Sequence, residues 1–231
     1  IVNFSHIKAS QRLCPFCRQG FAVSKSPPGL VEVCLRRLLH ANLSPESIRQ
    51  LPPRIRERLL ARTTNMRMIY GERLVELLRG FPGERLRLSY AVNLKPEDLV
   101  VGAPLIASQL RTIVVEAVPM LNDEGLRAVL AVSPEVLKHL DASMPSEHLS
   151  GECLAELAPR LAKLSHLNLA GCKGFTNESL MSTVRYVAPT LQVLNLSQCR
   201  RLDDQSLQAL TRCRSLRSLT MSGLWQVTTA A

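Results

Sequence analysis

The apolar positions of residues 164–210 form a pattern that occurs twice, at one constant offset. The matched residues are Leu164, Leu167, Leu169, Cys172, Phe175 and Leu180, and then Leu191, Leu194, Leu196, Cys199, Leu202 and Leu207. Six matches at a single offset indicate a structural repeat. Further steps of the same length backwards, and one slightly shorter step forwards, trace six copies within residues 83–231, the last of them incomplete.

Each copy predicts a short strand, a tight turn and a helix. In the phrase LxxLxL, alternate residues point to opposite sides of a strand, so the leucines face inward and the residues between them face out. We expect helices at Glu178–Tyr186 and Gln205–Arg212, with N-caps at Thr176-Asn177 and Asp203-Asp204. The expected strands are Leu86–Leu88, Ile113–Val115, Leu140–Ala142, Leu167–Leu169, Leu194–Leu196 and Leu219–Met221.

One strand–helix unit cannot bury its apolar face alone, so neighbouring units stack into an α/β solenoid with parallel strands and outer helices. The two clear copies also share a CxxΦ(T/D)(N/D) turn that begins at Cys172 and Cys199. These copies resemble the cysteine-containing leucine-rich repeats of F-box proteins and related ubiquitin-ligase receptors. The resemblance implies a leucine-rich-repeat solenoid that binds other proteins. An irregular array of helices is the alternative.

The outward strand positions supply a candidate binding surface on the concave face of such a solenoid. One predicted column contains Arg87, Val114, Asp141, Asn168, Asn195 and Thr220. The candidate contact residues are Arg87, His139, Asp141, His166, Asn168 and Asn195. His139 and His166 occupy the same outward position one copy apart, where neighbouring strands are about 4.8 Å apart. Stacked imidazoles could chelate a metal or respond to pH, and an ordinary protein-binding surface is the simpler interpretation.

The net charge of +10 is concentrated at one end of the 231-residue chain. Residues 1–85 carry 15 Lys and Arg against 6 Asp and Glu, whereas residues 86–231 carry 14 against 13. A basic segment can meet nucleic acid or an acidic protein partner, and a solvated arginine-rich helix surface is the simpler interpretation. The seven cysteines do not suggest a disulfide framework, which favours a reducing compartment such as the cytoplasm or nucleus.

Three further features concern membrane segments and the start of the chain. No apolar run approaches the roughly 20 residues of a membrane span, and no signal peptide is present. The chain begins at Ile1 rather than Met, so we expect a fragment or a processed form. We therefore expect no contact with a membrane.

Residues 1–29 are predicted to be loop-like and contain CPFCRQGF, with Cys14 and Cys17. A CxxC followed by glycine resembles one knuckle of a zinc ribbon, in which thiolates hold a tetrahedral metal. One structural zinc would need two more ligands, for which His6, Cys34 and His40 are candidates. A redox pair and two unligated loop thiols are the alternatives.

Residues 30–82 are predicted to form a helical module. Leu30, Cys34 and Leu38 recur at helical spacing after a Pro-Pro-Gly break. Their spacing resembles the BC box, the elongin C-binding helix of ubiquitin-ligase receptors of the SOCS and VHL types. The resemblance implies that Leu30 enters an apolar pocket on elongin C and that Cys34 allows close packing beside it. An ordinary core helix is the alternative.

The following segment resembles the VHL-type cullin box. Leu51, Pro52, Ile55 and Leu59 fit the pattern ΦPxxΦxxxΦ, and proline is favoured in the first turn of a helix. By resemblance these four residues would contact a cullin. A third helix at Gly71–Arg79 would complete the module. The LPLP sequence of SOCS-type boxes is absent, and the downstream segment of an F-box is absent as well.

The motifs of the common enzyme classes are absent from the sequence. It contains no Gly-rich phosphate loop, no GxSxG and no HExxH. We therefore predict a non-catalytic adaptor of an elongin–cullin ubiquitin ligase, whose repeats recruit a target protein and which acts on no small-molecule substrate. The alternative is a structural leucine-rich-repeat subunit of a ribonucleoprotein, such as an organelle ribosome or its assembly intermediate, with the basic N-terminal third on RNA. Its compartment would then be the mitochondrial matrix.

Overall fold

The computed structural model describes residues 38, 45–52, 55–60, 71–81, 83–106, 109–144 and 148–228. The chain forms two compact units, residues 1–47 and residues 48–231. Cys14 and Cys17 of the predicted zinc knuckle lie outside the described residues, as do Leu30 and Cys34 of the BC-box-like helix. Both assignments therefore remain predictions.

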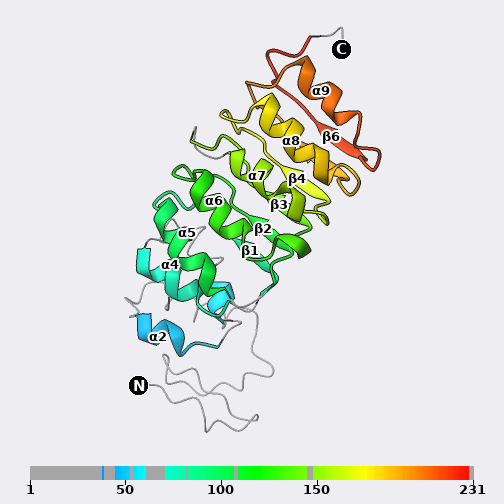
Figure 1. Cartoon of the computed structure of the whole chain (residues 1–231). Coiled ribbons are helices and arrows are strands. Elements are labelled where there is room, and N and C mark those ends of the chain that lie inside the picture. Colours follow the sequence, from blue (N-terminus) through cyan, green and yellow to red (C-terminus); the bar gives the residue numbers. More distant parts are fainter. Residues whose placement is uncertain are drawn as a thin grey trace, which may run out of the picture. The chain divides into compact units, whose positions relative to one another are not determined.

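Six parallel strands form one sheet in which sequence order and spatial order are the same. They are β1 (Arg85–Arg87), β2 (Thr112–Val114), β3 (His139–Asp141), β4 (His166–Asn168), β5 (Val193–Asn195) and β6 (Ser218–Thr220). The helices lie along one side of these strands, and each copy adds one layer to the stack (Figure 1). This is the α/β solenoid of a leucine-rich-repeat fold, as the sequence predicts.

The register of the sheet is the predicted one. Leu86 pairs with Ile113, and the same alignment continues through Leu140 and Leu167 to the last strand. The strands begin and end one residue earlier than predicted. The predicted end residues still extend the hydrogen-bond ladder, because the N–H of Leu88 donates to the Val114 carbonyl at 2.7 Å, and the next copies repeat this bond.

The core lies between the sheet and the helices. The central residue of each of β1–β5 is at most 1% exposed, and the inward residue just after each strand is fully buried. At about 25 cal/mol for each Å² of apolar surface removed from water, one such leucine contributes roughly 1.5–3 kcal/mol. In β6 the equivalent Leu219 is 39% exposed, because no described copy packs against it.

The outer layer consists of α-helices and short 3₁₀ helices. The α-helices are α5 (Pro96–Gly102), α6 (Asp123–Leu130), α7 (Glu152–Leu157), α8 (Asn177–Val187) and α9 (Asp204–Leu210). The 3₁₀ helices are η2 (Ala103–Leu105), η3 (Pro134–Val136) and η4 (Ala158–Arg160). The predicted caps are present, since Thr176 accepts the Ser179 N–H and Asp203 accepts the Gln205 N–H. Helix α9 ends two residues earlier than predicted, where the Thr211 hydroxyl donates to the Gln208 carbonyl.

Polar side chains join each copy to the next. The N-cap residue of α7 is Gly151, which has no side chain to cap the helix, and Asp123 of the preceding copy takes that role. Its carboxylate accepts the N–H groups of Ser150 (2.7 Å), Gly151 (3.1 Å) and Cys153 (3.2 Å). Burial alone would raise the pKa of Asp123, but these backbone donors outweigh burial and lower it.

Buried thiols make similar links. Cys172 donates to the Ala142 carbonyl at 3.3 Å, and Cys199 donates to the Leu169 carbonyl at 3.1 Å. Burial raises the pKa of the Cys199 thiol to about 12, so it stays protonated and remains a donor. Both cysteines are therefore structural parts of the repeat, as predicted.

The segment before the repeats is helical where the structure describes it. It contains α2 (Pro45–Arg49), helical residues 55–60, and α4 (Gly71–Leu78), which matches the third predicted helix. Glu76 of α4 is almost fully buried and accepts two hydrogen bonds from Arg49, at 2.5 and 2.6 Å. These bonds, with further ones from Arg79, lower the pKa of Glu76 to about 2.

The helical segment continues directly into the solenoid. Helix α4 packs against α5, and a methyl group at Gly102 would lie 2.7 Å from the Leu78 side chain. The Gly80 N–H donates to the Leu105 carbonyl at 2.7 Å. None of the helices in the described residues is long and apolar enough to cross a membrane.

Candidate protein-interaction face

The outward residues of the six strands form what we call the strand face, on the side of the sheet away from α5–α9. Its members are Arg85, Arg87, Thr112, Val114, His139, Asp141, His166, Asn168, Val193, Asn195, Ser218 and Thr220. All twelve are half-buried or exposed, whereas the residues between them are buried in the first five strands. The predicted column from Arg87 to Thr220 is confirmed, because its members pair in register along the sheet.

The two histidines of the strand face stack on each other, as their equivalent positions in neighbouring copies predict. The ring centroids of His139 and His166 are 5.2 Å apart with 29° between the ring planes. Burial, together with the neighbouring His166, lowers the pKa of His139. Within the described part of the chain, no group of three or more His, Cys, Asp or Glu side chains is placed to hold a metal ion.

Three polar side chains of the predicted contact column already accept hydrogen bonds from the backbone. The side-chain oxygens of Asp141, Asn168 and Asn195 each accept the N–H two residues further on, at 3.0–3.1 Å. Asp141 also accepts the Asn168 amide N–H at 3.0 Å. These Asx-type bonds end the strands and guide the chain into the turn. A partner therefore meets side chains that the fold already holds in place.

Beyond each strand, the backbone passes through the left-handed region at the same position of the copy. These left-handed turn positions are Tyr90 (φ 60°), Ala117 (φ 52°), Met144 (φ 51°), Gly171 (φ 78°), Gln198 (φ 63°) and Gly223 (φ 72°). In the first five, the N–H donates to a carbonyl of the next copy at 2.6–2.9 Å. Glycine fits this conformation without penalty, whereas other residues are strained in it by about 1–2 kcal/mol.

Two of the strained positions carry large apolar side chains that are exposed. Tyr90 is 48% exposed and Met144 is 62% exposed. The Tyr90 hydroxyl donates to the Glu116 carboxylate at 3.2 Å, and Glu116 lies 4.0 Å from the Arg87 guanidinium on the strand face. Exposed aromatic residues and methionines are typical of protein-binding surfaces. Strain at an exposed apolar side chain is also expected where a residue serves a function.

Tyr90 and Met144 were not among the contact residues predicted from the sequence. A signal was present, because steps of one repeat length back from Gly171 lead to Met144, Ala117 and Tyr90. A large apolar residue at a position that favours glycine marks an exposed site under strain.

The predicted cullin-contact residues differ in how accessible they are. Pro52 is exposed and Leu51 and Ile55 are half-buried, so a partner could reach these three. Leu59 is only 3% exposed and belongs to the core of the helical segment. Leu38, the last predicted elongin-contact residue, is helical and 8% exposed.

Comparison with known proteins adds two findings. A family model described as a leucine-rich repeat matches residues 187–210, which include the end of α8, all of β5 and all of α9. A chain in the crystal structure of the Rad7 and Elc1 complex in yeast is 13% identical with a TM-score of 0.30. The match covers 88% of this chain and 83% of that one. A likeness this weak bears on neither mechanism nor partners. No curated protein matches the sequence.

Proposed function

We propose that this chain is a non-catalytic adaptor that binds a target protein through its strand face. The observation that carries the proposal is the pair of exposed, strained residues Tyr90 and Met144 beside an outward surface in unbroken register. Stacked repeats hold such a surface rigidly, so binding costs little loss of side-chain freedom. Tyr90 and Met144 would supply apolar anchors, and the polar strand-face residues would supply directional contacts.

The target-binding role can be tested with variants that do not unfold the protein. Met144→Gly removes the exposed side chain and also relieves the left-handed strain, so the variant should be at least as stable as the wild type. Affinity purification with quantitative mass spectrometry should then lose partners with this variant. The matched control is Met120→Gly, because Met120 is also exposed (49%) but is not itself in the left-handed conformation. Loss of the same partners with both variants would refute the assignment of the strand face.

We further propose that the helical segment attaches the adaptor to elongin C and a cullin. The proposal is supported by the BC-box-like spacing of Leu30, Cys34 and Leu38 and by the cullin-box-like residues that follow them. Pro52 and Ile55 are accessible for such a contact, whereas Leu59 would support the helix from inside. Ubiquitin transfer itself would be carried out by other subunits, and this chain would supply proximity.

The attachment can be tested with purified elongin C. The double variant Leu30→Ala and Cys34→Ala should lose capture of elongin C while retaining the circular dichroism of the folded repeats. The control carries Leu219→Ala and Cys213→Ala near the C-terminal end of the solenoid and should retain capture. Capture at the wild-type level by the Leu30 and Cys34 variant would refute the BC-box proposal.

The cullin contact needs its own variant. Pro52→Ala together with Ile55→Ala should lose the cullin while keeping elongin C, because the two boxes contact different partners. Simultaneous loss of elongin C would show instead that the helical segment is a single contact surface.

A second candidate function, binding to RNA, is favoured by the charge of residues 1–85. Several arginines of this segment are used within the protein, which weakens the case. Arg49 and Arg79 pair with Glu76, and Arg56 donates to the Arg79 carbonyl. Phosphate binding falls steeply with salt, whereas apolar contacts respond little. RNA capture that survives changes at Leu30 and Cys34 but fails after charge reversal at Arg54, Arg56 and Arg58 would favour this function over the adaptor.

A further inference from the structure

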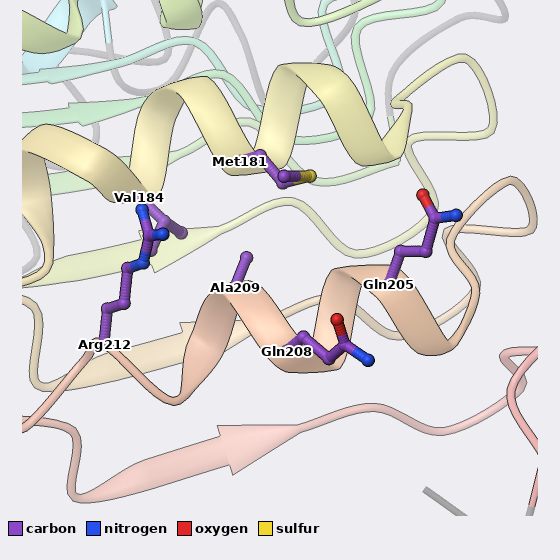
Figure 2. Close-up of a pocket in the computed structure, with 6 residues that line it drawn as sticks. All are labelled: Met181, Val184, Gln205, Gln208, Ala209 and Arg212. Carbon is purple, nitrogen blue, oxygen red and sulfur yellow. The ribbon is translucent and has the colours of Figure 1, made fainter.

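The outer side of α8 and α9 contains a hollow of about 410 Å³ that is separate from the strand face. It is lined by Met181 and Val184 of α8, by Gln205, Gln208 and Ala209 of α9, and by Arg212 just after α9 (Figure 2). The hollow lies between two adjacent helices, where the small side chain of Ala209 faces α8. A volume of this size is at the lower end of small-ligand and peptide-anchor sites.

The floor of the hollow is apolar and its rim is polar. Val184 is fully buried and Ala209 is 8% exposed, whereas Met181 is 48% exposed and can move to admit a ligand. Gln205 and Gln208 are exposed and each offers an amide donor and an amide acceptor. Such a combination can bury one apolar side chain and bond the peptide groups on either side of it.

Arg212 gives the hollow its charge. At the junction of the second and third copies, arginines meet acids on the helical side: Arg127 lies 2.7 Å from Glu156, and Arg160 lies 2.5 Å from Glu135. Within the described residues, the Arg212 guanidinium takes part in no ion pair and extends beside Val184 (Figure 2). Residues 200–217 contain five arginines against two aspartates, which makes this copy basic.

We propose that the hollow between α8 and α9 is a second docking site, for an acidic peptide segment of a partner protein. One leucine-sized side chain of the segment fills the space over Val184 and Ala209. A carboxylate beside it pairs with the Arg212 guanidinium. An apolar floor with a single guanidinium suits a peptide better than a nucleic acid, which needs several cations along a backbone.

The test uses full-length protein with methyl-¹³C methionine and three acetylated, amidated tripeptides as probes. The probes are Glu-Leu-Glu, its neutral counterpart Gln-Leu-Gln, and Glu-Ala-Glu, which lacks the apolar side chain. Glu-Leu-Glu should shift the Met181 methyl signal in a saturable way and leave that of Met144 unchanged. The other two probes should bind about three- to tenfold more weakly, as expected for loss of one exposed charge-assisted contact or of the apolar anchor.

Two variants test the role of Arg212 without disturbing the core. Arg212→Gln should remove the difference between Glu-Leu-Glu and Gln-Leu-Gln. Gln208→Glu should do the same, because its carboxylate would line the same hollow as Arg212 and pair with the guanidinium in place of the peptide. Arg214→Gln, an exposed arginine outside the lining, is the matched control and should leave the preference unchanged.

Three results would contradict the proposed docking site. Equal binding of the acidic and neutral tripeptides to the wild type would overturn the proposal, as would an unchanged preference in the Arg212→Gln protein. A uridine decanucleotide that shifts the Met181 signal at lower concentration than Glu-Leu-Glu would assign the basic copy to nucleic acid instead. Binding at Met181 is independent of Leu30 and Cys34, so failure of the elongin proposal would leave this test unaffected.

Discussion

Replacement of Ala117 by glycine should stabilise this protein, although glycine usually destabilises a folded chain. Ala117 has φ 52° at a left-handed turn position, and its N–H is held by the Ser143 carbonyl at 2.9 Å. An alanine in this conformation is strained by about 1–2 kcal/mol. Glycine relieves the strain but loses about 0.5–1 kcal/mol more conformational freedom on folding. The net gain should be about 0.5–1 kcal/mol.

The same change at Ala155 provides a matched control of opposite sign. Ala155 lies inside α7, and like Ala117 it is half-buried. Glycine in a helix interior costs about 0.8–1 kcal/mol relative to alanine. The two variants should therefore differ by roughly 1.5 kcal/mol in the free energy of unfolding, although each exchanges one alanine for one glycine.

Urea denaturation followed by circular dichroism measures both values. The denaturation midpoint should rise for Ala117→Gly and fall for Ala155→Gly, with equal slopes for the two proteins. Equal slopes matter because a repeat array can unfold in stages, and a changed slope would make the midpoints incomparable. If Ala117→Gly lowers the midpoint as much as Ala155→Gly, the turn is not left-handed and the shared turn geometry of the copies is wrong.

Three further predictions concern the core, a cap and the zinc knuckle. Leu167 is 1% exposed, so Leu167→Ala should lower the free energy of unfolding in urea by about 2–5 kcal/mol. Leu219 occupies the equivalent site but is 39% exposed, so Leu219→Ala should lower it much less. Equal losses would contradict the stacking order. The pKa of Asp123 is lowered in the folded chain, so the contribution of this carboxylate to stability should be complete above about pH 4. It should be lost as the pH falls through the lowered pKa. In a plot of the free energy of unfolding against pH, Asp123→Asn should remove this dependence. If Cys14 and Cys17 hold zinc, the purified chain should contain about one equivalent of metal, which Cys14→Ser or acid should release; metal-free protein would leave the pair as ordinary thiols.

The sequence predicted the fold well because one physical requirement recurs in every copy. A leucine-sized residue must face inward at the centre of each strand, and a slip of one residue would expose it to solvent. The pattern around Leu167 and Leu194 therefore determined the register, even in copies where it is degraded. The caps at Thr176 and Asp203 were equally predictable, since hydroxyl and carboxylate side chains before an apolar helix satisfy its first N–H groups.

The candidate sites were harder to predict, because they depend on neighbours that are distant in the sequence. The strand-face residue Asn168 was recognised as outward, but its bond to the Ala170 N–H depends on the backbone of the turn. The left-handed conformation of Tyr90 was hidden, because only Gly171 and Gly223 mark that position by residue type. The hollow over Ala209 exists only where α9 packs against α8. It therefore could not be found from either helix alone.

Both candidate binding sites contain residues that the fold itself does not require. The shared positions already serve the fold, since the Cys172 thiol and the Asp123 carboxylate join neighbouring copies. We therefore expect binding specificity to come from residues without such a structural role, such as Met144, where glycine fits better, and Arg212, which forms no ion pair within the described residues. The double variant Met144→Gly and Gln208→Glu should therefore unfold at a higher urea concentration than the wild type. It should nevertheless lose both the strand-face partner and the acidic tripeptide. Such a trade of function for stability is expected when strained or unpaired residues serve binding. Retention of both ligands by the double variant would show that Met144 and the unpaired Arg212 are not needed for binding.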